Sequence, residues 1–163
     1  DRNWNTGMNK SDIQFEVGDT VFNYRVVVLL NTPEGFMFEK SGDGFLFAVG
    51  GKVSINEDSV MTAKRELLEE VGYICHDPRL VAVIENYFLL IEDGRKYHEI
   101  SFVYHVDSGK SLNLSKFKSN NPHNKGFVSV KTQDFGNVII KPVVLPKIIL
   151  ENKEFVHVIN RET

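Results

Sequence analysis

Short apolar runs separated by turn residues predict a β-sheet in the first third of the chain. Residues 24–30 are apolar and β-branched, which is typical of a central strand. Residues 32–35 (TPEG) and 42–44 (GDG) are turn signals. We therefore expect strands at 13–17, 24–30, 36–38 and 45–48, the first of them only weakly alternating.

The later chain predicts a hairpin, a polar loop and a second helix. Two long apolar segments, residues 80–91 and 96–106, flank Asp93-Gly94 and indicate a β-hairpin. Residues 108–126 are polar and contain no Asp or Glu, and 127–130 fit a short strand. Residues 142–152 favour a helix in spite of Pro146. With no repeat and no linker, residues 1–163 are expected to form one α/β domain with a mostly antiparallel or mixed sheet.

Between these strand regions, residues 57–73 (EDSVMTAKRELLEEVGY) predict an amphipathic helix. Ser54 and Glu57 have the spacing of a capping box, which predicts the helix start, and Gly72 fits its end. The apolar residues that recur at helical spacing and should pack on the sheet are Val60, Ala63, Leu67 and Val71.

The opposite side of this helix carries an unusual concentration of charge. Glu66, Glu69 and Glu70 share a face, and Glu57 lies two to three turns earlier on about the same side. Arg65 relieves only part of the repulsion, which costs roughly 0.2–0.5 kcal/mol per pair. A hard divalent cation would remove it. A solvated surface helix is the ordinary alternative, but it does not account for Gly50-Gly51 upstream and the fixed spacing of the charges.

The pattern Gly51, Glu57, Arg65-Glu66, Glu69-Glu70, Gly72 resembles the signature of the Nudix hydrolase family, G-x5-E-x7-R-E-U-x-E-E-x-G-U, in which U is a bulky aliphatic residue. Every charged and glycine position of the signature is present. Three departures accompany it: Tyr73 at the last U position, Val49 where a proline is common, and Asn56 where a glycine is common. Asn tolerates a left-handed backbone better than other non-glycine residues, so the turn at residue 56 should survive.

This resemblance implies an α/β/α sandwich with a mixed central sheet, and a metal site on the helix. The implied ligands of Mg²⁺, or of Mn²⁺ in its place, are the Gly51 carbonyl, Glu57, Glu66, Glu69 and Glu70. Glu66 is a ligand or a general base, and Arg65 orients a glutamate instead of touching substrate. Such a site suits hydrolysis of a pyrophosphate linkage, in which metal ions neutralise charge and activate water.

Other candidate residues lie outside the motif. Some family members take their base from a late loop, but residues 108–126 have no carboxylate, so Glu99 is the best outside candidate and Glu85 the second. An ordinary outward-facing strand residue is the alternative for both. Arg25 and Lys40 are candidate phosphate contacts, and Tyr87 is a candidate for base stacking; surface charge and core packing are the alternatives.

Composition excludes several classes of protein. The net charge of −3 gives no reason to expect binding to nucleic acid or to a membrane. The single cysteine, Cys75, cannot form an internal disulfide. No signal peptide or membrane-spanning segment is predicted, so we expect a cytoplasmic protein. Many members of the family form homodimers, but no interface is recognisable in the sequence.

The sequence therefore predicts a Mg²⁺-dependent hydrolase of a nucleoside diphosphate linked to another group, such as a nucleoside triphosphate, a nucleotide sugar or a dinucleoside polyphosphate. A module of the same fold that senses a nucleotide without turnover is the alternative, although such modules often lose motif carboxylates. An isomerase of allylic diphosphates is disfavoured, because its expected cysteine would lie in a catalytic loop, whereas Cys75 follows the helix.

Overall fold

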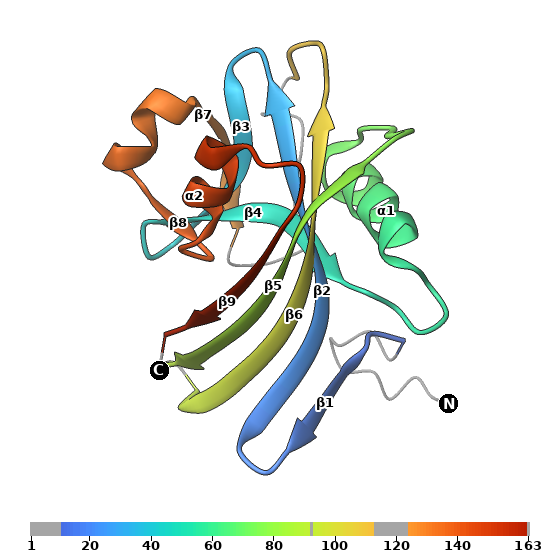
Figure 1. Ribbon diagram of the computed structural model, residues 1–163, viewed down its shortest axis with the longest axis vertical. Helices are drawn as coiled ribbons and strands as arrows, with labels where there is room; N and C mark the ends of the chain where they lie inside the picture. The colour runs from blue at the N-terminus through green and yellow to red at the C-terminus, as the bar shows by residue number, and fades with distance from the viewer. Residues whose placement is uncertain (1–10, 92, 113–123, 163) are drawn as a thin grey trace.

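A single mixed sheet forms the centre of the computed structural model, which describes residues 11–91, 93–112 and 124–162 (Figure 1). In chain order the elements are β1 (Gln14–Val17), β2 (Thr20–Thr32), β3 (Gly35–Ser41), β4 (Phe45–Lys52), α1 (Ser59–Val71), β5 (Arg79–Leu90), β6 (Arg95–Asp107), β7 (Asn124–Val130), the 3-10 helix η2 (Thr132–Asn137), β8 (Ile139–Lys141), α2 (Leu145–Glu151) and β9 (Val156–Arg161).

The strand order across the sheet is β7-β3-β4-β2-β6-β5-β9, with β1 paired to β2 and β8 paired to β4. β2 and β6 pair in parallel, as do β5 with β9 and β4 with β8, whereas the remaining pairings are antiparallel. The central sheet is therefore mixed, as the resemblance implied.

The two α-helices cover opposite faces of this sheet. Successive side chains of a strand point to opposite faces, and β2 divides its side chains between two core clusters. Val26, Val28 and Leu30 pack with α1, whereas Val27 and Leu29 pack with α2. The α/β/α arrangement is confirmed, and the face on which a strand residue lies follows from its position in the register.

The hairpin predicted from residues 80–106 is confirmed as β5 and β6. The second helix is shorter than predicted, because it begins at Leu145; Pro146 lies in its first turn, where a missing N–H is tolerated. The prediction that Val60 packs on the sheet is wrong: it is 37% exposed, and Thr62 and Glu66 are buried in the helix instead. Strands β8 and β9 were not predicted.

Among the described residues, the helices are too short or too polar to cross a membrane. The polar segment at 113–123, where the sequence places the late loop, lies outside the described residues.

Candidate active site

The N-cap of α1 lies four residues later than the capping box predicts, at Asp58 instead of Ser54. Asp58 is the N-cap, and its side chain accepts a hydrogen bond from the backbone N–H of Met61 at 2.8 Å. Ser54 and Glu57 do meet, because the Ser54 backbone N–H donates to Glu57 Oε1 at 3.1 Å, but this contact lies in the loop before the helix. Asp58 thus takes over the capping role and leaves the Glu57 carboxylate available to Arg65.

The two turn residues of the motif behave as predicted. Gly72 ends the helix in the left-handed conformation, with φ of 62°. Asn56 also has a positive φ, 68°, so asparagine supports the turn at which the family commonly has glycine.

Arg65 is the centre of the charged face of α1. Its guanidinium donates to both oxygens of Glu57, through Nε at 2.8 Å and Nη2 at 2.9 Å. Nη1 donates to Glu66 at 2.9 Å and to Glu69 at 3.2 Å, and Nη2 also reaches the Lys52 carbonyl at 3.1 Å. One cation therefore holds three carboxylates and the end of β4 in one arrangement, with the planar fork that only arginine provides.

These contacts and the burial of the side chains shift the pKa values of the glutamates in opposite directions. The hydrogen bonds from Arg65 lower the pKa of Glu57 to about 2, so this carboxylate stays ionised. Glu66 is only 9% exposed, and its burial raises its pKa against the opposing charge of Arg65. A buried carboxyl with a raised pKa is one form that a general base takes, although ion-pair networks produce the same shift.

The glycine at the start of the motif makes room for one of these carboxylates. A Cβ atom on Gly51 would lie 2.5 Å from the Glu66 carboxylate carbon and from its Oε2. The Glu66 carboxylate therefore fills the space that a side chain at position 51 would occupy, and a larger residue at 51 would displace it.

Glu70 contacts a residue that the sequence reasoning missed. Its carboxyl hydrogen-bonds with that of Glu39 on β3. Burial, and then this contact with Glu39, raise the pKa of Glu70 to about 9. Among the described residues its Oε2 atom is buried without a hydrogen-bond partner. A single glutamate in a strand gave no sequence signal; only the β3 register places it beside the helix.

Two basic residues flank the motif on the neighbouring strands. Arg25 of β2 pairs with Lys52 of β4, directly after Gly51, and its charge acts to lower the pKa values of Glu66 and Glu70. Lys52 was not selected from the sequence. Lys40 is exposed and pairs with Leu46, four residues before Gly50, so the strand separates it from the glycines by about 13 Å at 3.3 Å per residue.

The outside candidates lie on β5 and β6. Glu99 accepts a hydrogen bond from the side-chain amide of Asn23 at 2.8 Å, and its charge acts on Lys52. In the register, a row of four polar residues crosses the sheet on the same face as Arg25: Asn23, Glu99, Asn86 and Asn160. Asn23 is 3% exposed, and its Oδ1 atom has no hydrogen-bond partner among the described residues.

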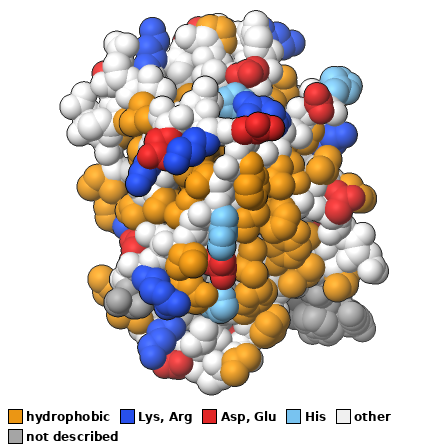
Figure 2. Space-filling view, in the orientation of Figure 1, with side chains coloured by type: hydrophobic (Ala, Val, Ile, Leu, Met, Phe, Trp, Pro, Cys, Tyr) orange, Lys and Arg blue, Asp and Glu red, His pale blue; other side chains and the backbone are white. Residues whose placement is uncertain are grey.

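Tyr87 and Glu85 lie on the other face of the sheet, because they alternate with Asn86. Tyr87 lies under the Arg161 guanidinium, 4.2 Å from the ring centroid, and against His98. Glu85 contacts His157 at 2.6 Å. Figure 2 shows hydrophobic side chains gathered over the middle of β5 and β6. The structure therefore separates Tyr87 and Glu85 from the face that carries Arg25 and Glu99.

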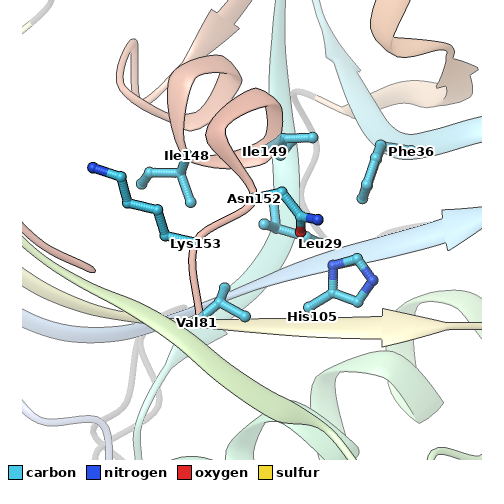
Figure 3. A pocket seen from close by; sticks show the side chains of 8 residues that line it. All are labelled: Leu29, Phe36, Val81, His105, Ile148, Ile149, Asn152 and Lys153. Atoms are coloured by element: carbon cyan, nitrogen blue, oxygen red, sulfur yellow. The ribbon is translucent and has the colours of Figure 1, made fainter. Parts of the chain in front are cut away.

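A small cavity lies under α2, away from the charged helix. Figure 3 shows it between the last turn of α2 and the sheet, and its lining includes Leu29, Phe36, Ile148 and His105. The cavity has a volume of about 30 Å³, which is about the volume that one water molecule occupies in the liquid. It is too small for a nucleotide.

Carboxylate and carbonyl oxygens are suitable ligands for a divalent metal, but the side chains of the described residues do not converge on a preformed metal site. No group of three or more acidic, histidine or cysteine side chains in 11–91, 93–112 and 124–162 lies close enough to hold a metal. Arg65 forms ion pairs with Glu57, Glu66 and Glu69. These ion pairs account for the distances between the three carboxylates in this arrangement. The buried oxygen of Glu70 and the Glu66 carboxylate that lies against Gly51 are the features that a bound cation would use.

Comparisons with known proteins agree with this geometry. The family model described as NUDIX domain matches residues 21–133, more than half of the chain. The chain therefore belongs to the Nudix family, and it is a hydrolase of the kind that acts on pyrophosphate bonds. A search of curated proteins finds no match.

Several solved structures share the fold at low sequence identity. A MutT protein from Bacillus halodurans is 16% identical with a TM-score of 0.60, covering 82% of this chain and 85% of that one. An ADP-ribose pyrophosphatase from Streptococcus suis is 11% identical with a TM-score of 0.52, covering 85% and 98%. The dihydroneopterin triphosphate pyrophosphohydrolase of E. coli is 13% identical with a TM-score of 0.53, covering 78% and 92%. At these identities the likeness establishes the fold alone.

Proposed function

We propose that this protein is a Mg²⁺-dependent pyrophosphohydrolase of a nucleoside diphosphate linked to another group, with residues 1–163 as a single catalytic domain. The observation that carries the proposal is the organised set of carboxylates on α1. Arg65 holds Glu57, Glu66 and Glu69 beside Gly51, and Glu70 presents a buried oxygen without a partner among the described residues.

Glu66, Glu69 and Glu70, with Glu57 and the Gly51 carbonyl, would hold the cation. When bound, Mg²⁺ or Mn²⁺ supplies charge neutralisation and Lewis acidity at phosphate oxygens. Arg65 keeps the Glu57 carboxylate ionised and in place, so Arg65 acts as a positioning residue. Glu66 and Glu99 are the candidates for the base that takes a proton from water. Glu66 is buried beside Gly51, and the charge of Glu99 reaches the same strand end through Lys52.

The substrate would lie where β2 and β4 pair beside Gly51, next to Arg25, whose side chain is on the sheet face opposite the α1 face. Arg25 and Lys52 are adjacent cations beside the two glycines, which suits a diphosphate. Asn23 and Glu99 offer hydrogen-bond acceptors on the same face, which suits hydroxyl or amino groups of a nucleoside. Lys40 and Tyr87 keep their predicted substrate roles only as weaker candidates, because Lys40 lies along β3 away from the glycines and the Tyr87 ring is already covered by the Arg161 guanidinium.

The two pyrophosphatase relatives carry different substrates in their names, so the substrate must be found by experiment. Purified protein is incubated with Mg²⁺ and canonical and oxidised nucleoside triphosphates, ADP-ribose, nucleotide sugars and dinucleoside polyphosphates. Release of phosphate, pyrophosphate or nucleotide is measured with and without EDTA. We expect one class to be hydrolysed, and activity to be lost in EDTA and restored by Mg²⁺.

Nucleotide binding without turnover of any substrate would favour a sensing module. Full activity in EDTA would refute the metal assignment. A cytoplasmic location, a homodimer, and the lack of binding to nucleic acid or membrane stay predictions from the sequence.

A further inference from the structure

Glu39 is a carboxylate outside the helix motif that the β3 register directs towards the candidate metal site. Met37, two residues earlier, packs in the core cluster under α1, whereas Phe38 packs on the α2 side. Because strand side chains alternate, Glu39 shares the α1 face with Met37. It pairs with Phe47 of β4 and Phe127 of β7, so β3 is held between two strands and its position is fixed.

The side chain of Glu39 hydrogen-bonds with Glu70, the last glutamate of the motif. Two carboxyl groups stay in contact only when a proton or a cation lies between them, because two adjacent carboxylates repel. The second oxygen of Glu70, Oε2, is buried and has no hydrogen-bond partner among the described residues. The pair therefore has an unused acceptor in a place that water reaches poorly.

The fixed cation of the motif does not serve this pair. Arg65 donates to Glu57, Glu66, Glu69 and the Lys52 carbonyl, and its described hydrogen bonds include neither Glu39 nor Glu70. The charge of Arg25 acts on Glu70, but more weakly than Glu39 itself does. Arg65 therefore serves Glu57, Glu66 and Glu69, and the contact described for the Glu70 carboxyl is the one with Glu39.

Mg²⁺ is commonly bound by one or two carboxylates together with waters and substrate phosphates, so it does not require a complete protein cage. A pair of carboxyls with an unused buried oxygen suits this mode of binding. We propose that Glu39 and Glu70 bind the divalent cation together, so that β3 supplies a metal ligand from outside residues 51–73. This inference rests on the proposed function, since it assigns a ligand to the same site.

Metal binding is measured directly, with Mn²⁺ as the probe, by the loss of the free-ion EPR signal on titration of the full chain. Glu39→Gln keeps the shape of the side chain and removes its charge, and Glu70→Gln does the same on the helix. Glu34→Gln, an exposed glutamate in the turn before β3, is the matched control. The stability of each variant is measured in EDTA by urea unfolding.

We expect Glu39→Gln to weaken Mn²⁺ binding about tenfold or more, as loss of a ligand or its partner does. The double variant should bind Mn²⁺ about as weakly as Glu70→Gln alone, because residues that act as a unit are not additive. In EDTA, Glu39→Gln should be at least as stable as the wild type, because its amide can donate to Glu70. The control should match the wild type in both measurements.

Wild-type Mn²⁺ affinity in Glu39→Gln would overturn the inference, and lower stability in EDTA with unchanged affinity would assign Glu39 a structural role instead. If the wild type also hydrolyses its substrate with Mg²⁺, the proposed function survives that failure. If the wild type binds no Mn²⁺, both the inference and the metal assignment fail. If Glu39→Gln loses affinity but the wild type hydrolyses nothing, only the hydrolase assignment fails.

Discussion

Arg65 provides the strongest test of the structural account, because one side chain holds three carboxylates. The perturbation is Arg65→Met, which keeps much of the length and the apolar stem while removing the charge and the five donors. Its partners differ in exposure: the side chains of Glu57 and Glu66 are 13% and 11% exposed, whereas that of Glu69 is 50% exposed.

The magnitude follows from these exposures. Removing one partner of a fully buried ion pair costs about 3–5 kcal/mol, because the other charge stays buried and unpaired. The i,i+4 pair with Glu69 is largely exposed and contributes only about 0.3–0.5 kcal/mol. Since Arg65 is itself 29% exposed, we expect Arg65→Met to lower the free energy of unfolding by about 3 kcal/mol in EDTA.

Urea unfolding followed by circular dichroism measures this loss. Lys64→Met is the matched control, because Lys64 is an exposed residue of the same helix, and such surface substitutions usually change stability by about 0.5 kcal/mol or less. A double-mutant cycle with Glu57→Gln should give a coupling of about 1–2 kcal/mol, within the range for contacting charged residues. A loss below about 1 kcal/mol for Arg65→Met would refute the reasoning.

Three further predictions concern pH and the glycine of the motif. The pKa of Glu57 is lowered to about 2, so its carboxylate should contribute roughly 1–2 kcal/mol to the free energy of unfolding after solvent screening. This contribution is complete above pH 4.5 and is lost as the pH falls towards 2. Glu57→Gln should therefore flatten the dependence of stability on pH in that window, and an unchanged dependence would contradict the pairing with Arg65. The pKa of Glu70 is raised to about 9, so the metal-free protein should lose stability as pH rises from 5 to 9, and Glu70→Gln should reduce this slope. Gly51→Ala places a Cβ against the flexible end of Glu66, which must shift away from Arg65, and should lower stability by about 1 kcal/mol in urea unfolding. Gly136→Ala, which meets open space, is its control, and equal effects of the two substitutions would argue against the close approach at Gly51.

Local sequence signals predicted the parts of the fold that local chemistry determines. The apolar runs of β2, β5 and β6 and the glycine after α1 are each visible within a few residues. Strand β9 was missed because it alternates between intermediate and exposed residues and gains its place only by pairing with β5. Strand β8 has three residues, too few for a periodic signal.

The residues of the candidate site likewise fall into those that local sequence spacing predicts and those that it does not. The helical glutamates and Arg65 were predicted because their spacing is fixed within one helix. Glu39 was missed because only the register of the sheet brings it to the motif, and Lys52, although it follows Gly51 in the chain, was missed because only the register pairs it with Arg25. Competition between neighbouring residues also misled the prediction of the helix start, where Asp58 caps the helix and Glu57 pairs with Arg65 instead.

The central claim is that the α1 carboxylates support Mg²⁺-dependent hydrolysis. Its most direct test is the turnover rate of Glu69→Gln on the substrate identified for the wild type, at saturating Mg²⁺. Glu69 is half exposed, so the substitution should leave the fold intact, and Glu151→Gln on α2 is the control. We predict a rate at least about a hundredfold below the wild type for Glu69→Gln, as for loss of a group that stabilises the transition state, and no change for the control. A wild-type rate in folded Glu69→Gln would contradict the assignment of the active site to this helix.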